Sequence, residues 1–169
     1  MHPFRSNGSD IIHETDLVSF DVFDTLILRP FVRPTDLFRL MEEAYGRPGY
    51  AEARIDAERR ARSLSSGCEI TLQDIRSEIE PDMRAMVDSE VQIEAELSVP
   101  DPDALRMMDE ASQKSEVVLI SDMYLSANAV KSILDRCGIS GYSRLYVSSE
   151  CGATKHTGEL FRIVSEESG

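Results

Sequence analysis

Residues 17 to 25 read Leu-Val-Ser-Phe-Asp-Val-Phe-Asp-Thr, a short apolar run that passes into polar residues. The run ends at Asp21, and Asp24 and Thr25 follow on what must be a tight turn. In open α/β sheets the chemistry lies beyond the carboxyl ends of buried strands. Two carboxylates and a hydroxyl within five positions are unsuited to a hydrophobic core and are typical of a functional site. The stretch therefore suggests Asp21 as a nucleophile.

Two later apolar runs are predicted to be strands of the same sheet. Residues 117–120 read Val-Val-Leu-Ile, as in a strand covered on both faces, and residues 145–147 form a shorter run. Helix-period patterns and capping residues predict the intervening helices, over 34–45, 50–64, 71–79, 81–97, 104–113, 126–137 and 159–166. This alternation predicts an α/β fold with a parallel sheet and right-handed crossovers. We expect 1–30 and 101–169 to form the core and 31–100 an inserted, all-helical cap.

Three reactive side chains follow the three predicted strands. Asp21 follows the first strand, Ser121 the second, and Lys155 comes shortly after the third. Because the carboxyl ends of parallel strands share one edge of a sheet, these groups should converge on one crevice. A carboxylate nucleophile with a hydroxyl and an amine suits attack on a phosphoryl group. Mg²⁺ would be needed to bring the anionic nucleophile against an anionic substrate.

Bulk composition limits the classes of partner. The chain has 169 residues, 41% of them hydrophobic, and a net charge of −13. This charge argues against nucleic acid or an anionic membrane, which both require clustered Lys and Arg. No apolar run approaches the ~18 residues of a membrane span, and residues 1–10 lack the apolar segment of a signal peptide. Three scattered cysteines without metal-ligand spacing indicate reduced thiols and a cytoplasmic protein.

Three stretches carry a resemblance to a known family. Residues 20–26 (Phe-Asp-Val-Phe-Asp-Thr-Leu) resemble the first motif of the haloacid dehalogenase (HAD) superfamily. Residues 119–126 resemble its second motif, and residues 153–161 its third. The sequences of these motifs, together with Arg29-Pro30 and Asp36-Leu37-Phe38, are similar to those of a bacterial branch of hydrolases. Members of this branch are often found with surface-polysaccharide glycosyltransferases. The similarity runs from about residue 17 to residue 161.

The resemblance implies a Rossmann-like core with a helical cap between the first and second motifs. It implies that Asp21 is the nucleophile and that the backbone carbonyl of Phe23 is a metal ligand beside it. Ser121 and Lys155 would bind the phosphate and balance its charge. We add the hydroxyl of Thr25 to the predicted phosphate-binding residues, since it lies in the same motif.

Position 23 departs from the pattern of the phosphatases in this superfamily. They usually carry a second Asp two residues after the nucleophile, as acid and base, whereas this chain has Phe23 there. Losing such a group typically costs ~10²–10⁴ in rate. The dehalogenase branch also lacks an acid there, because halide leaves without a proton. Asp24 replaces the acid if the turn aims it inward; otherwise it caps the turn.

The fourth motif of the superfamily, an acidic pair that supplies metal ligands, is absent from these residues. With Asp21 as the one obvious carboxylate ligand, we expect weak Mg²⁺ binding and impaired turnover. The fourth strand would pair beside the first, so its absence would expose a sheet edge and favour self-association. We expect the sequence to be the N-terminal part of a longer protein.

Some charged residues invite two interpretations. Arg29 and Arg33 either meet an anionic substrate at the edge of the cap or are surface charges beside a hinge. His156, next to Lys155, is interpreted as a solvated loop residue. The charges of residues 52–62 are interpreted as a solvated helix face with i,i+4 pairs.

The leading hypothesis is a Mg²⁺-dependent phosphatase that acts on a small phosphorylated metabolite through an aspartyl-phosphate on Asp21. One alternative is hydrolysis of a carbon–halide bond, as in a 2-haloacid dehalogenase, which Phe23 favours and the Ser121–Lys155 pair disfavours. The other is a binding or interaction module without catalysis, linked to glycosyltransferases.

Overall fold

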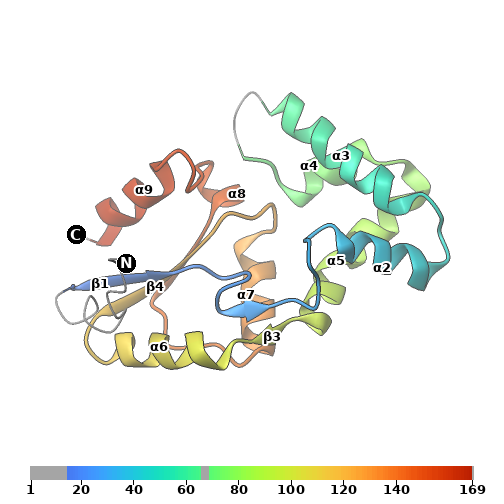
Figure 1. Cartoon of the computed structure of the whole chain (residues 1–169). Coiled ribbons are helices and arrows are strands. Elements are labelled where there is room, and N and C mark those ends of the chain that lie inside the picture. The colour runs from blue at the N-terminus through green and yellow to red at the C-terminus, as the bar shows by residue number, and fades with distance from the viewer. Residues whose placement is uncertain (1–14, 66–68, 169) are drawn as a thin grey trace, which may run out of the picture.

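A three-stranded parallel sheet lies at the centre of the computed structural model, which describes residues 15–65 and 69–168. Its strands are β1 (Leu17–Phe20), β4 (Glu116–Ser121) and β5 (Arg144–Val147), in the order β1-β4-β5. The register pairs Phe20 with Leu119 and Ser121 with Val147. The carboxyl ends of all three strands therefore lie at one edge of the sheet (Figure 1).

Helices cover both faces of the sheet (Figure 1). On one face, Val117 and Leu119 of β4 belong to a cluster with residues of α6 (Pro102–Ser112) and α7 (Ala127–Arg136). On the other face, Val118 and Ile120 belong to a cluster with residues of α9 (Glu159–Ser168). A short helix, α8 (Ser148–Cys151), directly follows β5. A strand buried on both faces explains why β4 is apolar without alternation.

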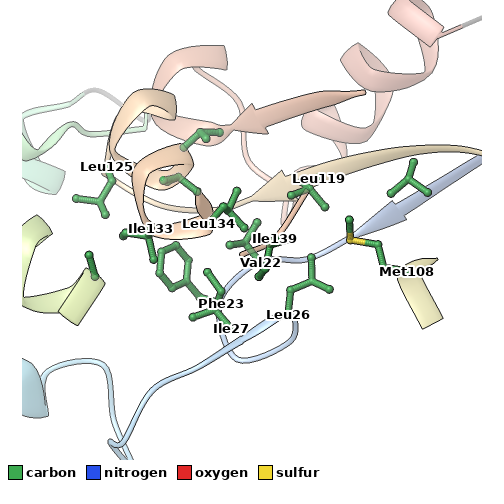
Figure 2. Packing of buried hydrophobic residues seen from close by; sticks show 14 of the residues in the cluster. Val22, Phe23, Leu26, Ile27, Met108, Leu119, Leu125, Ile133, Leu134 and Ile139 are labelled. Carbon is green, nitrogen blue, oxygen red and sulfur yellow. The ribbon is translucent and has the colours of Figure 1, made fainter. Parts of the chain in front are cut away.

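The residues just after β1 belong to the larger of these two clusters. Val22, Phe23, Leu26 and Ile27 are buried there, and Figure 2 shows them beside Leu119 and side chains of α7. Burial of large apolar side chains stabilises a fold by about 1.5–3 kcal/mol each. The turn that carries Asp21 and Asp24 is thus held in place by its own apolar residues.

A helical insertion separates β1 from β4 in the sequence. It contains α2 (Asp36–Tyr45), α3 (Tyr50–Leu64), α4 (Leu72–Glu78) and α5 (Arg84–Leu97), with a 3₁₀ turn at Pro81–Met83. These helices enclose a hydrophobic cluster of their own and lie beyond the end of the sheet (Figure 1).

A small antiparallel ribbon joins the helical insertion to the rest of the molecule. β2 (Ile27–Leu28) leads into the insertion and β3 (Val99–Pro100) leads out of it, with Ile27 opposite Pro100. The Asp101 amide also donates a hydrogen bond of 2.9 Å to the Leu26 carbonyl. The sequence pattern did not predict this ribbon, because two residues per strand are too few to give a periodic signal.

The α/β fold class and the parallel sheet are confirmed, and each predicted helix is present with ends shifted by a few residues. Within the part of the chain that the structure describes, no helix has the length and apolarity to cross a membrane.

The interpretation of residues 52–62 as a solvated face is wrong for one residue. Arg54 is completely buried, and its guanidinium is bound by the buried carboxylate of Glu90 on α5. The other arginines of this segment are exposed to solvent. Because most charged residues of this helical segment are exposed, the sequence did not distinguish Arg54 as the arginine that faces inward.

Candidate active site

The turn after β1 gives the site its shape. The amides of Leu26 and Ile27 both donate to the Val22 carbonyl, at 2.9 Å each, and the Asp24 amide donates to the Ile27 carbonyl at 2.7 Å. Asp24 has a φ of 59°, in the left-handed region that Asp and Asn tolerate better than other residues with a side chain. This conformation explains why an acidic residue, and not a bulky one, stands at position 24.

Asp21 is bound through both carboxylate oxygens. Lys155 Nζ lies 2.5 Å from Oδ1, and Thr25 Oγ1 donates to Oδ2 at 3.3 Å. Lys155 Nζ also donates to the Ile120 carbonyl at 3.1 Å, which ties it to the end of β4. The carboxylate of Asp21 is half-exposed, so it is oriented by its neighbours and still open to a substrate.

The loop that carries Lys155 is held by a carboxylate from the end of β4. The single backbone N–H of Lys155 donates a bifurcated hydrogen bond to the two carboxylate oxygens of Asp122, at 2.9 and 3.0 Å. Ser121, one residue earlier, is buried at the last position of β4. β4 and β5 are neighbours in the sheet, so the two loops that follow them start side by side.

Most of the predicted site residues line one cavity of about 270 Å³. Asp21, Ser121 and Lys155 all line it, so the expected convergence at the edge of the sheet is present. Phe23, Asp24 and Asp122 line it as well, whereas Thr25 is outside the lining and reaches the site through its bond to Asp21.

Arg29 connects the turn to the helical insertion at the same cavity. Its Nε donates to Asp24 Oδ1 at 3.2 Å, its Nη2 binds Asp24 Oδ2, and its Nη1 donates to Glu94 Oε1 on α5 at 3.0 Å. Its guanidinium also lies 5.1 Å from the centre of the Phe23 ring. The Arg29 side chain is 7% exposed, so it is not a surface charge beside a hinge.

Asp24 and Glu94 differ sharply in their exposure although they share Arg29. The Asp24 side chain is 61% exposed, and the Glu94 side chain is 4% exposed. Burial raises the pKa of Glu94, and this effect outweighs the lowering by Arg29. Among the described residues, the Asp24 carboxylate binds Arg29 and makes no hydrogen bond to its own turn. Its role as acid and base stays a prediction.

The oxygen donors at the cavity suit Mg²⁺ in part. Asp21, Asp122 and Phe23 line the cavity. The two carboxylates and the Phe23 backbone carbonyl are the donors that would hold the ion. Mg²⁺ is commonly bound through one or two carboxylates, waters and substrate phosphates. Within residues 15–65 and 69–168, no group of three or more His, Cys, Asp or Glu side chains is placed to hold a metal ion. The donors therefore fit an ion shared with a bound phosphate better than a site made of protein ligands alone.

Glu94 was not among the site residues predicted from the sequence. Glu90 and Glu94 follow Met86 at intervals of four residues, so they lie on the buried stripe of α5. This four-residue spacing could have indicated Glu94. An acidic residue on the buried side of a helix needs either a charged partner or a place in a functional site.

No family model matches this sequence, and no curated protein matches it. Solved structures with the same fold do exist. L-2-haloacid dehalogenase from Xanthobacter autotrophicus, with chloropropionic acid covalently bound, matches with a TM-score of 0.58 at 14% identity. YfnB from Bacillus subtilis, described as a HAD-hydrolase and bound to magnesium, matches with a TM-score of 0.60 at 17% identity. 2-Haloacid dehalogenase from Pseudomonas syringae pv. Tomato DC3000 has a TM-score of 0.52 at 12% identity.

These matches cover most of this chain and less of the other proteins. The match covers 89% of this chain and 64% of the Xanthobacter dehalogenase, 89% and 72% for YfnB, and 81% and 65% for the Pseudomonas dehalogenase. At such low identity the likeness shows the fold alone. The chain has the fold of HAD-superfamily hydrolases.

Proposed function

We propose that this protein is a HAD-type phosphatase that hydrolyses a small phosphorylated metabolite through an aspartyl-phosphate on Asp21. The observation that carries the proposal is the meeting of Asp21, Ser121 and Lys155 around one cavity at the carboxyl edge of the sheet. A volume of about 270 Å³ suits a phosphate with a small organic group, near the lower end for ligand sites.

Each of the three side chains has a part in the first step. The Asp21 carboxylate attacks phosphorus, and the bond to the leaving oxygen breaks. Ser121 and Lys155 donate hydrogen bonds to the equatorial oxygens, where negative charge must be held. Lys155 is already within 2.5 Å of Asp21, so its ammonium offsets the repulsion between the carboxylate and the phosphate. Thr25 keeps the second carboxylate oxygen in place.

Mg²⁺ would be held by Asp21, Asp122 and the Phe23 carbonyl. When bound, it supplies charge neutralisation for a phosphate beside a carboxylate. The helical insertion would act as a cap that excludes water, with the β2–β3 ribbon as its base. The Arg29–Glu94 hydrogen bond lies where the insertion meets the turn after β1. It would form when the cap is closed and break when the cap opens.

The test is phosphatase activity on a panel of sugar phosphates and p-nitrophenyl phosphate with Mg²⁺. We expect activity that is lost on adding EDTA and reduced at least about 10³-fold in Asp21→Asn, because that variant lacks the nucleophile. The trapped phosphoenzyme should carry its phosphate on Asp21, as peptide mapping after quenching would show.

A matched control is Asp16→Asn, which makes the same chemical change on the amino-terminal side of β1, away from the cavity. We expect it to keep wild-type activity. Activity that survives in Asp21→Asn, or the lack of any turnover by the wild type, would refute the proposal.

A second candidate is hydrolysis of a carbon–halide bond. It is favoured by Phe23, which is buried in the core cluster and offers no acid two residues after Asp21. The fold is also that of a dehalogenase with a ligand covalently bound. Chloride release from 2-chloropropionate without metal, together with silence on the phosphate panel, would favour this candidate.

A further inference from the structure

Phosphate transfer to Asp21 leaves one chemical need unmet by the residues assigned so far. An alkoxide is a poor leaving group, so an acid must give it a proton as the phosphorus–oxygen bond breaks. Phe23 is 9% exposed and its ring packs in the core cluster, so it contributes no proton. An acid would have to come from another element that lines the same cavity.

Glu94 is such a group, and it comes from the helical insertion. It lies on α5, lines the cavity together with Asp21 and Lys155, and is almost completely shielded from bulk water. One oxygen, Oε1, accepts a hydrogen bond of 3.0 Å from Arg29. Among the described residues, the other oxygen, Oε2, has no hydrogen-bond partner. Glu94 therefore has one oxygen anchored and one free.

The surroundings of Glu94 favour a proton on it, because burial raises its pKa more than the neighbouring cation Arg29 lowers it. Arg29 is a single cation shared between two carboxylates, and the exposed one, Asp24, is stabilised by water as well. Burial of the Glu94 carboxyl therefore favours its neutral form. The negative charge of Asp24 raises the pKa of Glu94 further, and Arg54 on α3 lowers it. Glu90 on α5 and Tyr124 after β4 also interact with Glu94 electrostatically.

We propose that Glu94 is the acid that protonates the leaving oxygen when Asp21 attacks phosphorus, an inference that rests on the proposed phosphatase function. As the Asp21–phosphorus bond forms, the electron pair of the breaking bond stays on the leaving oxygen, which takes the proton of Glu94. In the second step the Glu94 carboxylate accepts a proton from water, whose oxygen bonds to phosphorus. The bond from phosphorus to Asp21 then breaks and both carboxyl groups return to their starting states.

The test compares two substrates of similar shape in Glu94→Gln. p-Nitrophenyl phosphate releases a stable phenolate and needs little protonation, whereas benzyl phosphate releases an alkoxide. In single-turnover experiments we expect release of benzyl alcohol to slow by about 10²–10⁴-fold and release of p-nitrophenol to stay nearly unchanged. Equal losses for both substrates, or no loss for benzyl phosphate, would overturn the proposal.

Two further variants sharpen the result. Glu96→Gln makes the same change two residues along α5, at an exposed side chain outside the cavity, and should leave both rates unchanged. Asp24→Asn tests the rival acid on the other side of Arg29. Selective loss of benzyl phosphate turnover in Asp24→Asn, with none in Glu94→Gln, would assign the proton to Asp24 instead.

The wild type provides a test that does not depend on a variant that folds. Benzyl phosphate turnover should fall as the pH rises and Glu94 loses its proton, while the first step with p-nitrophenyl phosphate should not. Identical pH profiles for the two substrates would refute the role of Glu94 alone. Failure of the wild type to turn over either substrate would refute the proposed function and this inference with it.

Discussion

At the scale of single residues, the most unusual feature is a buried ion pair in the helical insertion. Arg54 Nε and Nη2 donate to the two carboxylate oxygens of Glu90, at 2.6 and 2.9 Å. Tyr50 donates its hydroxyl to Glu90 Oε1 at 2.8 Å. The guanidinium also lies over the rings of Phe38 and Tyr124, at 4.4 and 5.0 Å from their centres. Neither charge faces water, so each depends on the other.

Glu90→Gln should destabilise the fold by about 3–5 kcal/mol, because it leaves the Arg54 charge buried without its main partner. The double variant Arg54→Met/Glu90→Gln should recover part of this loss, since no isolated charge then remains. Urea unfolding followed by circular dichroism measures both changes. A double variant less stable than Glu90→Gln would contradict this account.

The control is Arg59→Met on the same helix. Arg59 is exposed and pairs with Asp56 at 2.8 Å. Surface pairs of this kind contribute about 0–1 kcal/mol, so the variant should unfold close to the wild type.

At the scale of elements, α4 illustrates how a short helix is fixed at its start. Thr71 Oγ1 accepts a hydrogen bond from the Asp74 amide at 3.2 Å, and Asp74 Oδ2 accepts one from the Thr71 amide at 2.8 Å. The Thr71 hydroxyl also donates to Asp74 Oδ2 at 2.7 Å. A helix of seven residues has little stability of its own, so this capping box and the burial of Ile75 determine whether it forms.

Thr71→Ala should lower the free energy of unfolding by about 0.5–2 kcal/mol, since it removes the hydrogen bonds that the Thr71 hydroxyl makes with the Asp74 amide and carboxylate. Hydrogen bonds from the Thr71 side chain and amide lower the pKa of Asp74. A carboxyl whose pKa is lowered by folding stabilises the fold above its unfolded pKa, and this contribution is lost as the pH falls through its folded pKa. The difference between the two proteins should therefore shrink in acid. Urea midpoints across the acidic range measure it.

Ser77→Ala is the control for this helix. Its exposed hydroxyl donates to the Gln73 carbonyl at 2.9 Å, which is already part of the helix. The substitution should change stability little and show no dependence on pH. A Thr71→Ala effect that grows in acid would be inconsistent with the capping box.

At the scale of the whole molecule, the sheet and the helical insertion share a few residues between their hydrophobic clusters. Tyr124, in the loop after β4, and Leu72, at the start of α4, pack against both clusters. The Leu72 amide also donates to the Tyr124 carbonyl at 2.8 Å. Because Tyr124 also lines the cavity beside Asp21, the contact between the two parts lies next to the site.

The wild type should unfold in one cooperative transition, because these shared contacts couple the two parts. Tyr124→Ala should lower stability by about 2–4 kcal/mol and separate the unfolding of the helical insertion from that of the sheet. Hydrogen exchange measured by mass spectrometry resolves the two parts. Tyr142→Ala is the control, since Tyr142 packs only against the cluster of the sheet within the described residues and should leave one transition.

The local elements of this fold were largely predictable from the sequence. The apolar run of β4 and the helix period of α2 are local patterns that burial imposes directly, and the Ser126 cap marks the start of α7. The order of reactive residues after strands also predicted that Asp21, Ser121 and Lys155 would meet, because parallel strands place their carboxyl ends together. The β2–β3 ribbon and the short helix α8 were not predicted, since a few residues carry no periodic signal.

Patterns within single elements and the order of the strands were enough to predict the parallel sheet, the helical insertion and the three side chains at the edge of the sheet. The burial of Arg54 and the place of Glu94 at the cavity depend instead on how distant elements pack. In the folded structure Asp24 binds Arg29. The sequence can place a charged residue on the buried stripe of a helix, but the packing of distant elements decides which partner or site it faces.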